Sequence, residues 1–289
     1  MTQRDTIIQT VNEIEAMPPL AMDLINLLQC PDASINEVAD VIAHDPASAA
    51  NILKLANSAA MGSRTPITEI RQAVVRIGLA QTTRLVLQGV VAVHINKPVQ
   101  GYDLSPGSLW SFSAASAIAT QVLAKINDTP ASTQAYTAGL FQDLGKLVLG
   151  HFVRADGSAI QELAFERGYS FEQAEREVLG IDHAELGALL LESWGIGGVI
   201  NDAVRWHHEP EKSPETSKAI TQLVHVAGQI VNLAGIGGGT DGSQYKPSQQ
   251  ALDDLSIKPK QVEQVMRETL LQFDALKSLT LQTSGGNPS

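Results

Sequence analysis

The chain has 289 residues, of which 44% are apolar, 18% charged and 4% aromatic, so it is typical of a globular protein and too apolar to be disordered throughout. A formal net charge of −11 disfavours bulk binding of nucleic acid or of an anionic membrane. Its single cysteine, Cys30, excludes an internal disulfide and a thiolate metal cluster. The most apolar stretch, residues 85–95, is too short to span a bilayer, although its valines also fit a strand. No signal peptide is visible, and we expect a cytoplasmic protein without membrane insertion.

Apolar residues recur at helical spacing along most of the chain, whereas strict alternation is almost absent. Capping chemistry places the helix starts. Residues 34–37 and 170–173 fit the capping box, and Asp45-Pro46, Thr65-Pro66 and Ser105-Pro106 each put a capping residue before a proline. The predicted helices cover residues 4–16, 20–29, 35–43, 46–58, 66–77, 80–95, 106–126, 132–152, 158–167, 171–179, 183–194, 198–208, 216–234 and 259–278.

Two breaks interrupt this helical pattern. Residues 96–107 contain prolines and glycines and mark a boundary between lobes, while residues 235–243 are glycine-rich enough to form a flexible surface loop. The sequence therefore predicts an all-α, two-lobed helical bundle. Its N-terminal lobe is expected over residues 1–100, its C-terminal lobe over residues 101–280, and a disordered tail over residues 281–289.

Charge is distributed unevenly along the chain. Residues 46–102 hold six basic residues and one acidic residue, although the whole chain is acidic. Such bases either lie on solvated helix faces or pair with acids elsewhere in the fold, or they form a docking surface for an acidic protein partner or a phosphate-bearing ligand. The arginines expected at that surface are Arg64, Arg71, Arg76 and Arg84.

Seven short motifs carry a resemblance to a known family. They are Met17-Pro18-Pro19-Leu20, His44-Asp45-Pro46, residues 55–59 (LANSA), residues 67–79 (ITEIRQAVVRIGL), residues 138–147 (AGLFQDLGKL), residues 183–187 (HAELG) and residues 206–210 (WHHEP). Each piece alone is unspecific. Their order and spacing, over about residues 10–275, resemble the HDOD family, a bacterial signalling module related to the HD-domain metal-dependent phosphohydrolases.

The resemblance implies a site at Asp143, because HD hydrolases hold divalent metal between histidines and carboxylates to activate water. At the matching positions, Gln142 replaces a histidine of the active pattern, Phe112 replaces another histidine, and Gly228 replaces the distal aspartate. An amide is a poor ligand for a catalytic transition metal, and neither phenylalanine nor glycine offers a ligand side chain. The resemblance therefore implies a degenerate site.

What remains of the pattern is Asp143, His183, His207 and His208. Consecutive helical residues diverge by about 100°, so His207 and His208 face one site only if their helix ends there. These histidines are either structural, capping helices or bonding to carbonyl groups, or they retain a divalent metal such as Fe, Mn, Mg or Zn. Lys146, one turn after Asp143, is expected to form an ion pair with that carboxylate.

The function predicted from these residues is a non-catalytic signal-transduction module that binds a protein partner and needs no cofactor. Two alternatives stay open. One is a metal-dependent phosphohydrolase with an atypical centre that uses Asp143, His183 and His207. The other is a sensor that binds a nucleotide without hydrolysing it.

Overall fold

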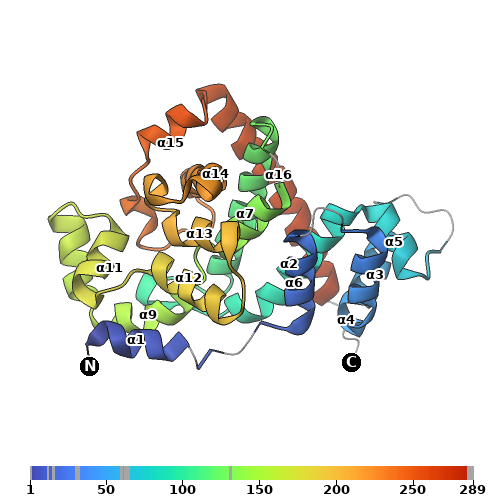
Figure 1. Ribbon diagram of the computed structural model, residues 1–289, viewed down its shortest axis with the longest axis horizontal. Coiled ribbons are helices and arrows are strands. Elements are labelled where there is room, and N and C mark those ends of the chain that lie inside the picture. Colours follow the sequence, from blue (N-terminus) through green and yellow to red (C-terminus); the bar gives the residue numbers. More distant parts are fainter. Residues whose placement is uncertain are drawn as a thin grey trace. The chain divides into compact units, whose positions relative to one another are not determined.

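The computed structural model describes residues 2–11, 13–14, 17–29, 33–58, 61, 66–129 and 132–284. Within these residues the chain forms α-helices, short 3-10 and π-helical turns and one isolated bridge between Val99 and Leu104, without a β-strand (Figure 1). The all-α prediction is confirmed. Residues 85–95 belong to a helix, so the alternative of a strand there is wrong.

The chain divides into two compact units. The first comprises Met1–Glu15 and Ile95–Lys277, and the second Ala16–His94 and Ser278–Ser289. The N-terminal fifteen residues thus group with the unit that follows residue 94, although the sequence assigned them to the preceding lobe. Of the expected tail, residues 285–289 lie outside the described part of the chain, and helix is present up to Ser284.

The second unit is a small helical cluster. Its helices are α2 (Pro19–Gln29), α3 (Ile35–Ala43), α4 (Pro46–Ala56), α5 (Ile70–Ile77) and α6 (Leu79–Ile95). Helix α5 packs on α3 and α4 and buries Ala73, Val74 and Ile77. Because buried residues recur at helical spacing, the opposite face of α5 is left exposed.

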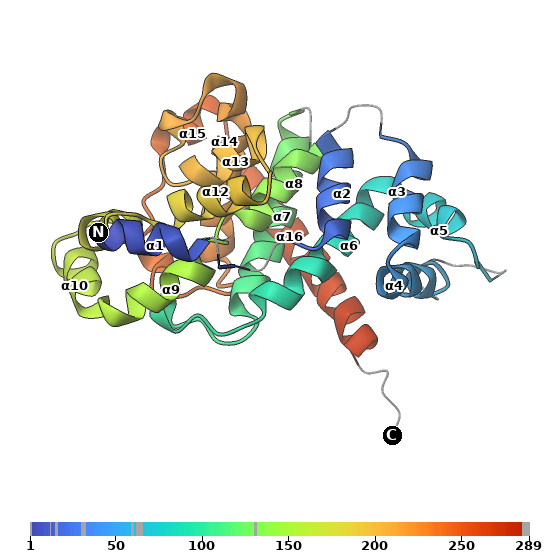
Figure 2. The ribbon, with the colours of Figure 1, turned by 60° about the horizontal axis from the view of Figure 1, so that its bottom comes forward.

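The first unit contains the remaining helices. They are α1 (Gln3–Val11), α7 (Ser108–Ile126), α8 (Ser132–Phe141), α9 (Lys146–Ala155), α10 (Gly157–Gln161), α11 (Phe171–Leu179), α12 (His183–Ser193), α13 (Gly198–Trp206), α14 (Glu215–Leu233), α15 (Gln249–Asp254) and α16 (Pro259–Ser284), which belongs to this unit up to Lys277. Helix α7 is rich in Ala and Ser and is buried almost throughout, between α8 and α14. Small side chains let these helices approach closely: a Cβ on Gly139 of α8 would lie 2.5 Å from the Thr120 hydroxyl of α7. Helix α1 packs against α9 and α12 (Figure 2).

Some of the predicted helix caps form, and others do not. Both capping boxes form, at Ser34 and Ser170, and Asp45 caps α4 ahead of Pro46. Ser105-Pro106 does not open a helix, because α7 begins at Ser108 after Gly107, which takes a left-handed φ of 82°. Thr65 lies outside the described residues.

Several helix boundaries differ from prediction. Helix α1 ends at Val11 instead of residue 16, and α15 was not predicted. The helix expected over residues 158–167 is α10 followed by a π-helical turn at Glu162–Glu166. Most important for function, the helix expected over residues 132–152 breaks into α8 and α9. Gly145 lies at this break so close to α12 that a Cβ there would be 1.9 Å from the His183 carbonyl oxygen.

Candidate functional site

Asp143 lies in the turn between α8 and α9 and is 1% exposed. Its Oδ2 accepts from the Lys146 ammonium group at 3.0 Å, so the expected ion pair forms. Lys146 is itself buried and donates to Asp241 Oδ2 at 2.6 Å. Burial alone would lower the pKa of Lys146, but Asp143 and Asp241 raise it above its ordinary value. The ammonium group therefore stays charged and joins two buried carboxylates.

His183 begins α12, directly after Asp182, which caps that helix through the Glu185 amide. The His183 ring is fully buried, and its Nδ1 lies 2.7 Å from Glu175 Oε2. Glu175 Oε1 in turn accepts from the Tyr102 hydroxyl at 2.7 Å. Burial alone would lower the pKa of His183, but the Glu175 carboxylate raises it to about 9. Glu175 thus fixes the ring and leaves its Nε2 pointing toward Asp143, at 3.5 Å from Oδ1.

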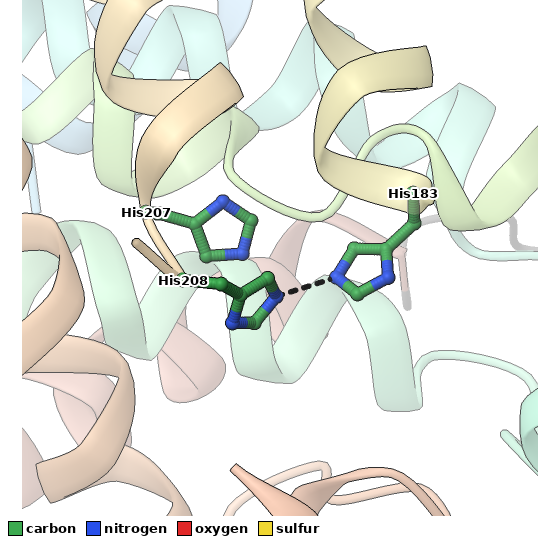
Figure 3. Close-up of side chains that lie close together, drawn as sticks. All are labelled: His183, His207 and His208. Atoms are coloured by element: carbon green, nitrogen blue, oxygen red, sulfur yellow. Dashed lines mark hydrogen bonds between the residues drawn. The ribbon is translucent and has the colours of Figure 1, made fainter. Parts of the chain in front are cut away.

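His207 and His208 follow the last turn of α13, and their rings point toward His183 (Figure 3). Because α13 ends at Trp206, the two consecutive histidines face the same site. The potential ligand atoms of the three histidines lie within 4.8 Å of one another, and His208 Nε2 is 2.8 Å from His183 Nε2. Burial lowers the pKa of both His207 and His208 well below the ordinary histidine value. Both rings are therefore neutral at neutral pH, the form in which imidazole binds metal.

Three buried polar atoms around this site have no hydrogen-bond partner: His207 Nε2, Asp143 Oδ1 and the amide nitrogen Nε2 of Gln142. His207 Nε2 and Asp143 Oδ1 lie 3.7 Å apart. The Nδ1 of His207 donates to the Val204 carbonyl at 2.7 Å, so Nε2 carries a lone pair and faces a carboxylate oxygen. At neutral pH the charged His183 ring lies beside the same carboxylate oxygen, with its Nε2 3.5 Å away. A divalent ion would replace the Nε2 proton of His183, and the donor set of Asp143, His183, His207 and His208 then fits an ion that prefers nitrogen and carboxylate ligands, such as Zn²⁺, Mn²⁺ or Fe²⁺.

Three further positions beside Asp143 offer no such ligands. Phe112, Gln142 and Gly228 border the same small cavity as Asp143, His207 and His208, with a volume of about 10 Å³, which is room for one water molecule. A Cβ on Gly228 would lie 3.4 Å from Gln142 Oε1. The three positions at which the sequence departs from the HD pattern therefore meet at one place in the fold.

The sequence analysis did not identify four residues that complete the site: Tyr102, Glu175, Asp241 and Tyr245. Tyr245 accepts from Lys146 at 2.9 Å and donates to Asp241 Oδ2 at 2.5 Å. Glu175 and Asp241 are almost completely buried. An acidic residue in an amphipathic helix, or beside glycines, carries no local sequence signal of burial, so only long-range packing could have identified these residues.

The arginines expected at a docking surface lie in the second unit, apart from Arg64, which is outside the described residues. Arg71 and Arg76 are exposed on α5, and the Arg76 guanidinium donates to the Met61 carbonyl at 3.3 Å. Arg84 is half-buried on α6, and its Nε donates to the Ala80 carbonyl at 3.0 Å. On α5 these cations flank Val75, whose side chain is 62% exposed.

Comparison with known proteins assigns the family. A sequence model of the HDOD domain matches residues 14–210, and the chain therefore belongs to the HDOD family. It is 25% identical, over 229 residues and 79% of its length, to an uncharacterised protein of Treponema pallidum, and it spans 44% of that protein. The chain thus covers less than half the length of this relative.

Two solved structures share the fold. One is a candidate phosphohydrolase from Shewanella amazonensis, which is 26% identical with a TM-score of 0.61 and coverage of 96% of this chain and 93% of the other. The second is a candidate signal transduction protein from Marinobacter aquaeolei, 22% identical with a TM-score of 0.73 and coverage of 98% and 62%. No helix among the described residues has both the length and the apolar character needed to cross a membrane.

Proposed function

We propose that this protein is a non-catalytic signalling module of the HDOD family that acts in the cytoplasm through a protein partner. The observation that carries the proposal is the meeting of Phe112, Gln142 and Gly228 at the cavity beside Asp143. These three residues do not supply the two histidines and the aspartate that the HD pattern has at their positions. The similarity to a candidate signal transduction protein supports the same role.

A second candidate function, a metal-dependent phosphohydrolase with an atypical centre, is favoured by one observation. His207 Nε2 and Asp143 Oδ1 are both buried and without a hydrogen-bond partner, as ligands of an absent cation would be. A divalent ion held by Asp143, His183, His207 and His208 would act as a Lewis acid toward a bound oxygen. The similarity to a candidate phosphohydrolase is consistent with this alternative.

Nucleotide sensing is less well supported by the same geometry. Pockets for small molecules usually enclose about 300–1,000 Å³, whereas the cavity at Asp143 measures about 10 Å³. A nucleotide would enter only after the surrounding side chains had moved.

The test of the first proposal is a turnover assay with Mn²⁺, Fe²⁺ or Zn²⁺ on cyclic dinucleotides and nucleoside phosphates. We expect no metal-stimulated hydrolysis by the wild-type protein. Hydrolysis that is abolished by Asp143→Ala would overturn the non-catalytic role and establish the phosphohydrolase. Asp5→Ala, at an exposed position of α1, is the matched control for contaminating activity.

The partner surface is proposed on the exposed face of α5, where Arg71 and Arg76 flank Val75. An acidic partner would gain electrostatic steering from the arginines and apolar contact from the valine. We expect Arg71→Glu/Arg76→Glu to lose the partner that the wild-type protein captures from lysate of its host. Lys260→Glu, an exposed charge reversal on α16, should retain it. Unchanged capture by the double variant, with an unchanged Tm, would exclude this face.

A further inference from the structure

One segment, Gly237–Ser248, which we call the strap, contacts the histidine site. Asp241 and Tyr245 in the strap both bind Lys146. The Tyr245 ring lies on the His208 ring, with centroids 4.4 Å apart and planes at 32°, and its hydroxyl is 3.5 Å from His183 Nε2. The strap therefore covers the His208 ring and approaches the His183 nitrogen that would bind a ligand.

Both ends of the strap are fixed to the first unit. At its start, a Cβ on Gly237 would lie 2.4 Å from the Ser108 carbonyl oxygen, and one on Gly239 would lie 2.5 Å from that of Tyr102. At its end, the Ser248 amide donates to His225 Nε2 at 2.9 Å, and His225 Nδ1 lies 2.7 Å from the His207 carbonyl. The glycines are thus required for close packing, and the expectation of a flexible surface loop is wrong for this part of the chain.

A groove of about 640 Å³ lies against the strap. Apolar residues of α14, including Ile230 and Leu233, form much of its wall, together with Pro247 and Tyr245 of the strap. Tyr245 also borders both of the small cavities that reach Asp143. One side chain therefore lies between this groove and the histidine cluster, in which His183 and His207 are buried and His208 is half-buried.

We propose that the strap is a gate, in which Tyr245 closes the path from the groove to His183 and His208 while the Asp241–Lys146 ion pair holds the gate shut. This inference deepens the proposed function, because it concerns access to the site suggested to hold a divalent ion. A ligand entering from the groove must displace the Tyr245 ring from His208. Loss of the ring opens the path without removing any of the four candidate ligands.

The gate is tested by the rate at which diethyl pyrocarbonate modifies His208, measured by peptide mass spectrometry on the full-length protein. This reagent attacks neutral imidazole, and exposed His44 and His151 serve as internal references in the same sample. We expect at least a tenfold faster modification of His208 in Tyr245→Ala, relative to the references. Tyr245→Phe keeps the ring and should stay within twofold of wild type, while Asp241→Asn should give an intermediate increase.

An unchanged rate in Tyr245→Ala, with normal reference rates, would overturn the gate. Equal acceleration of all histidines would report unfolding of Tyr245→Ala, and the modification rate of His208 in Asp241→Asn would then be compared with that in Tyr245→Phe. If the rate in Asp241→Asn also stays within twofold of wild type, the gate is rejected. Zn²⁺ release into excess chelator provides a separate readout, and we expect it to be faster in Tyr245→Ala. Absence of bound Zn²⁺ in wild type would reject the metal role alone, because the modification rates do not depend on metal.

Discussion

Two sets of residues around Asp143 have opposite chemistry. Phe112, Gln142 and Gly228 supply an aromatic ring, an amide and bare backbone to a cavity of about 10 Å³. His183, His207 and His208 supply three imidazoles whose ligand atoms lie within 4.8 Å of one another, and His207 and His208 border that same cavity. Residues that only fill space and residues suited to metal coordination therefore meet around one carboxylate.

Lys146 forms ion pairs with both Asp143 and Asp241 of the strap, so its charge compensates two buried carboxylates at this site. Replacing it by Met should destabilise the protein by about 3–5 kcal/mol, because two buried carboxylates lose their common partner. Urea denaturation monitored by circular dichroism measures the change in the free energy of unfolding. Lys125→Met, at the last turn of α7 and exposed, should shift it by less than about 0.5 kcal/mol. A loss below about 1 kcal/mol in Lys146→Met would mean that solvent reaches the ion pairs.

The role of the histidines is tested by metal content. His183→Ala/His207→Ala should lower the affinity for Zn²⁺ at least tenfold, since it removes two of four candidate ligands. The matched control, Phe112→Leu/Gln142→Ala, changes two residues at the same cavity that are not candidate ligands and should leave Zn²⁺ affinity within about twofold. Isothermal titration with elemental analysis gives affinity and stoichiometry. Equal losses in both variants would contradict the distinction between the two sets of residues, and no binding by wild type would identify the histidines as purely structural.

The sequence could predict features that depend on residues close together along the chain. Capping boxes at Ser34 and Ser170 depend on residues three positions apart, and both form. The helix break between Phe141 and Lys146 depends on the approach of Gly145 to α12, a partner some forty residues away, and periodicity alone extended the helix through it. The same limit applies to the site. The four residues expected there do lie together, while Asp241 and Tyr245 reach it only through tertiary packing of the strap.

The three positions without metal ligands beside Asp143 also allow a gain-of-function test. Phe112→His, Gln142→His and Gly228→Asp together would return imidazole and carboxylate groups to the cavity beside Asp143. The space at Gly228 tolerates a Cβ, because its nearest neighbour, Gln142 Oε1, would be 3.4 Å away. We expect the triple variant to bind up to one more equivalent of Mn²⁺ than wild type, with an affinity weakened by the competing Lys146 charge. Equilibrium dialysis measures the stoichiometry.

Asp143→Ala in the triple variant is the control for that experiment, because the three substituted positions border the same cavity as this carboxylate. It should remove the added equivalent, whereas binding at a surface position would survive it. If the triple variant stays folded and takes up no additional metal, then the lack of histidine and aspartate side chains at these three positions is not what prevents metal binding in this cavity. The cavity volume would then be the stronger barrier, and the loss of the HD pattern would have been followed by closer packing around Asp143.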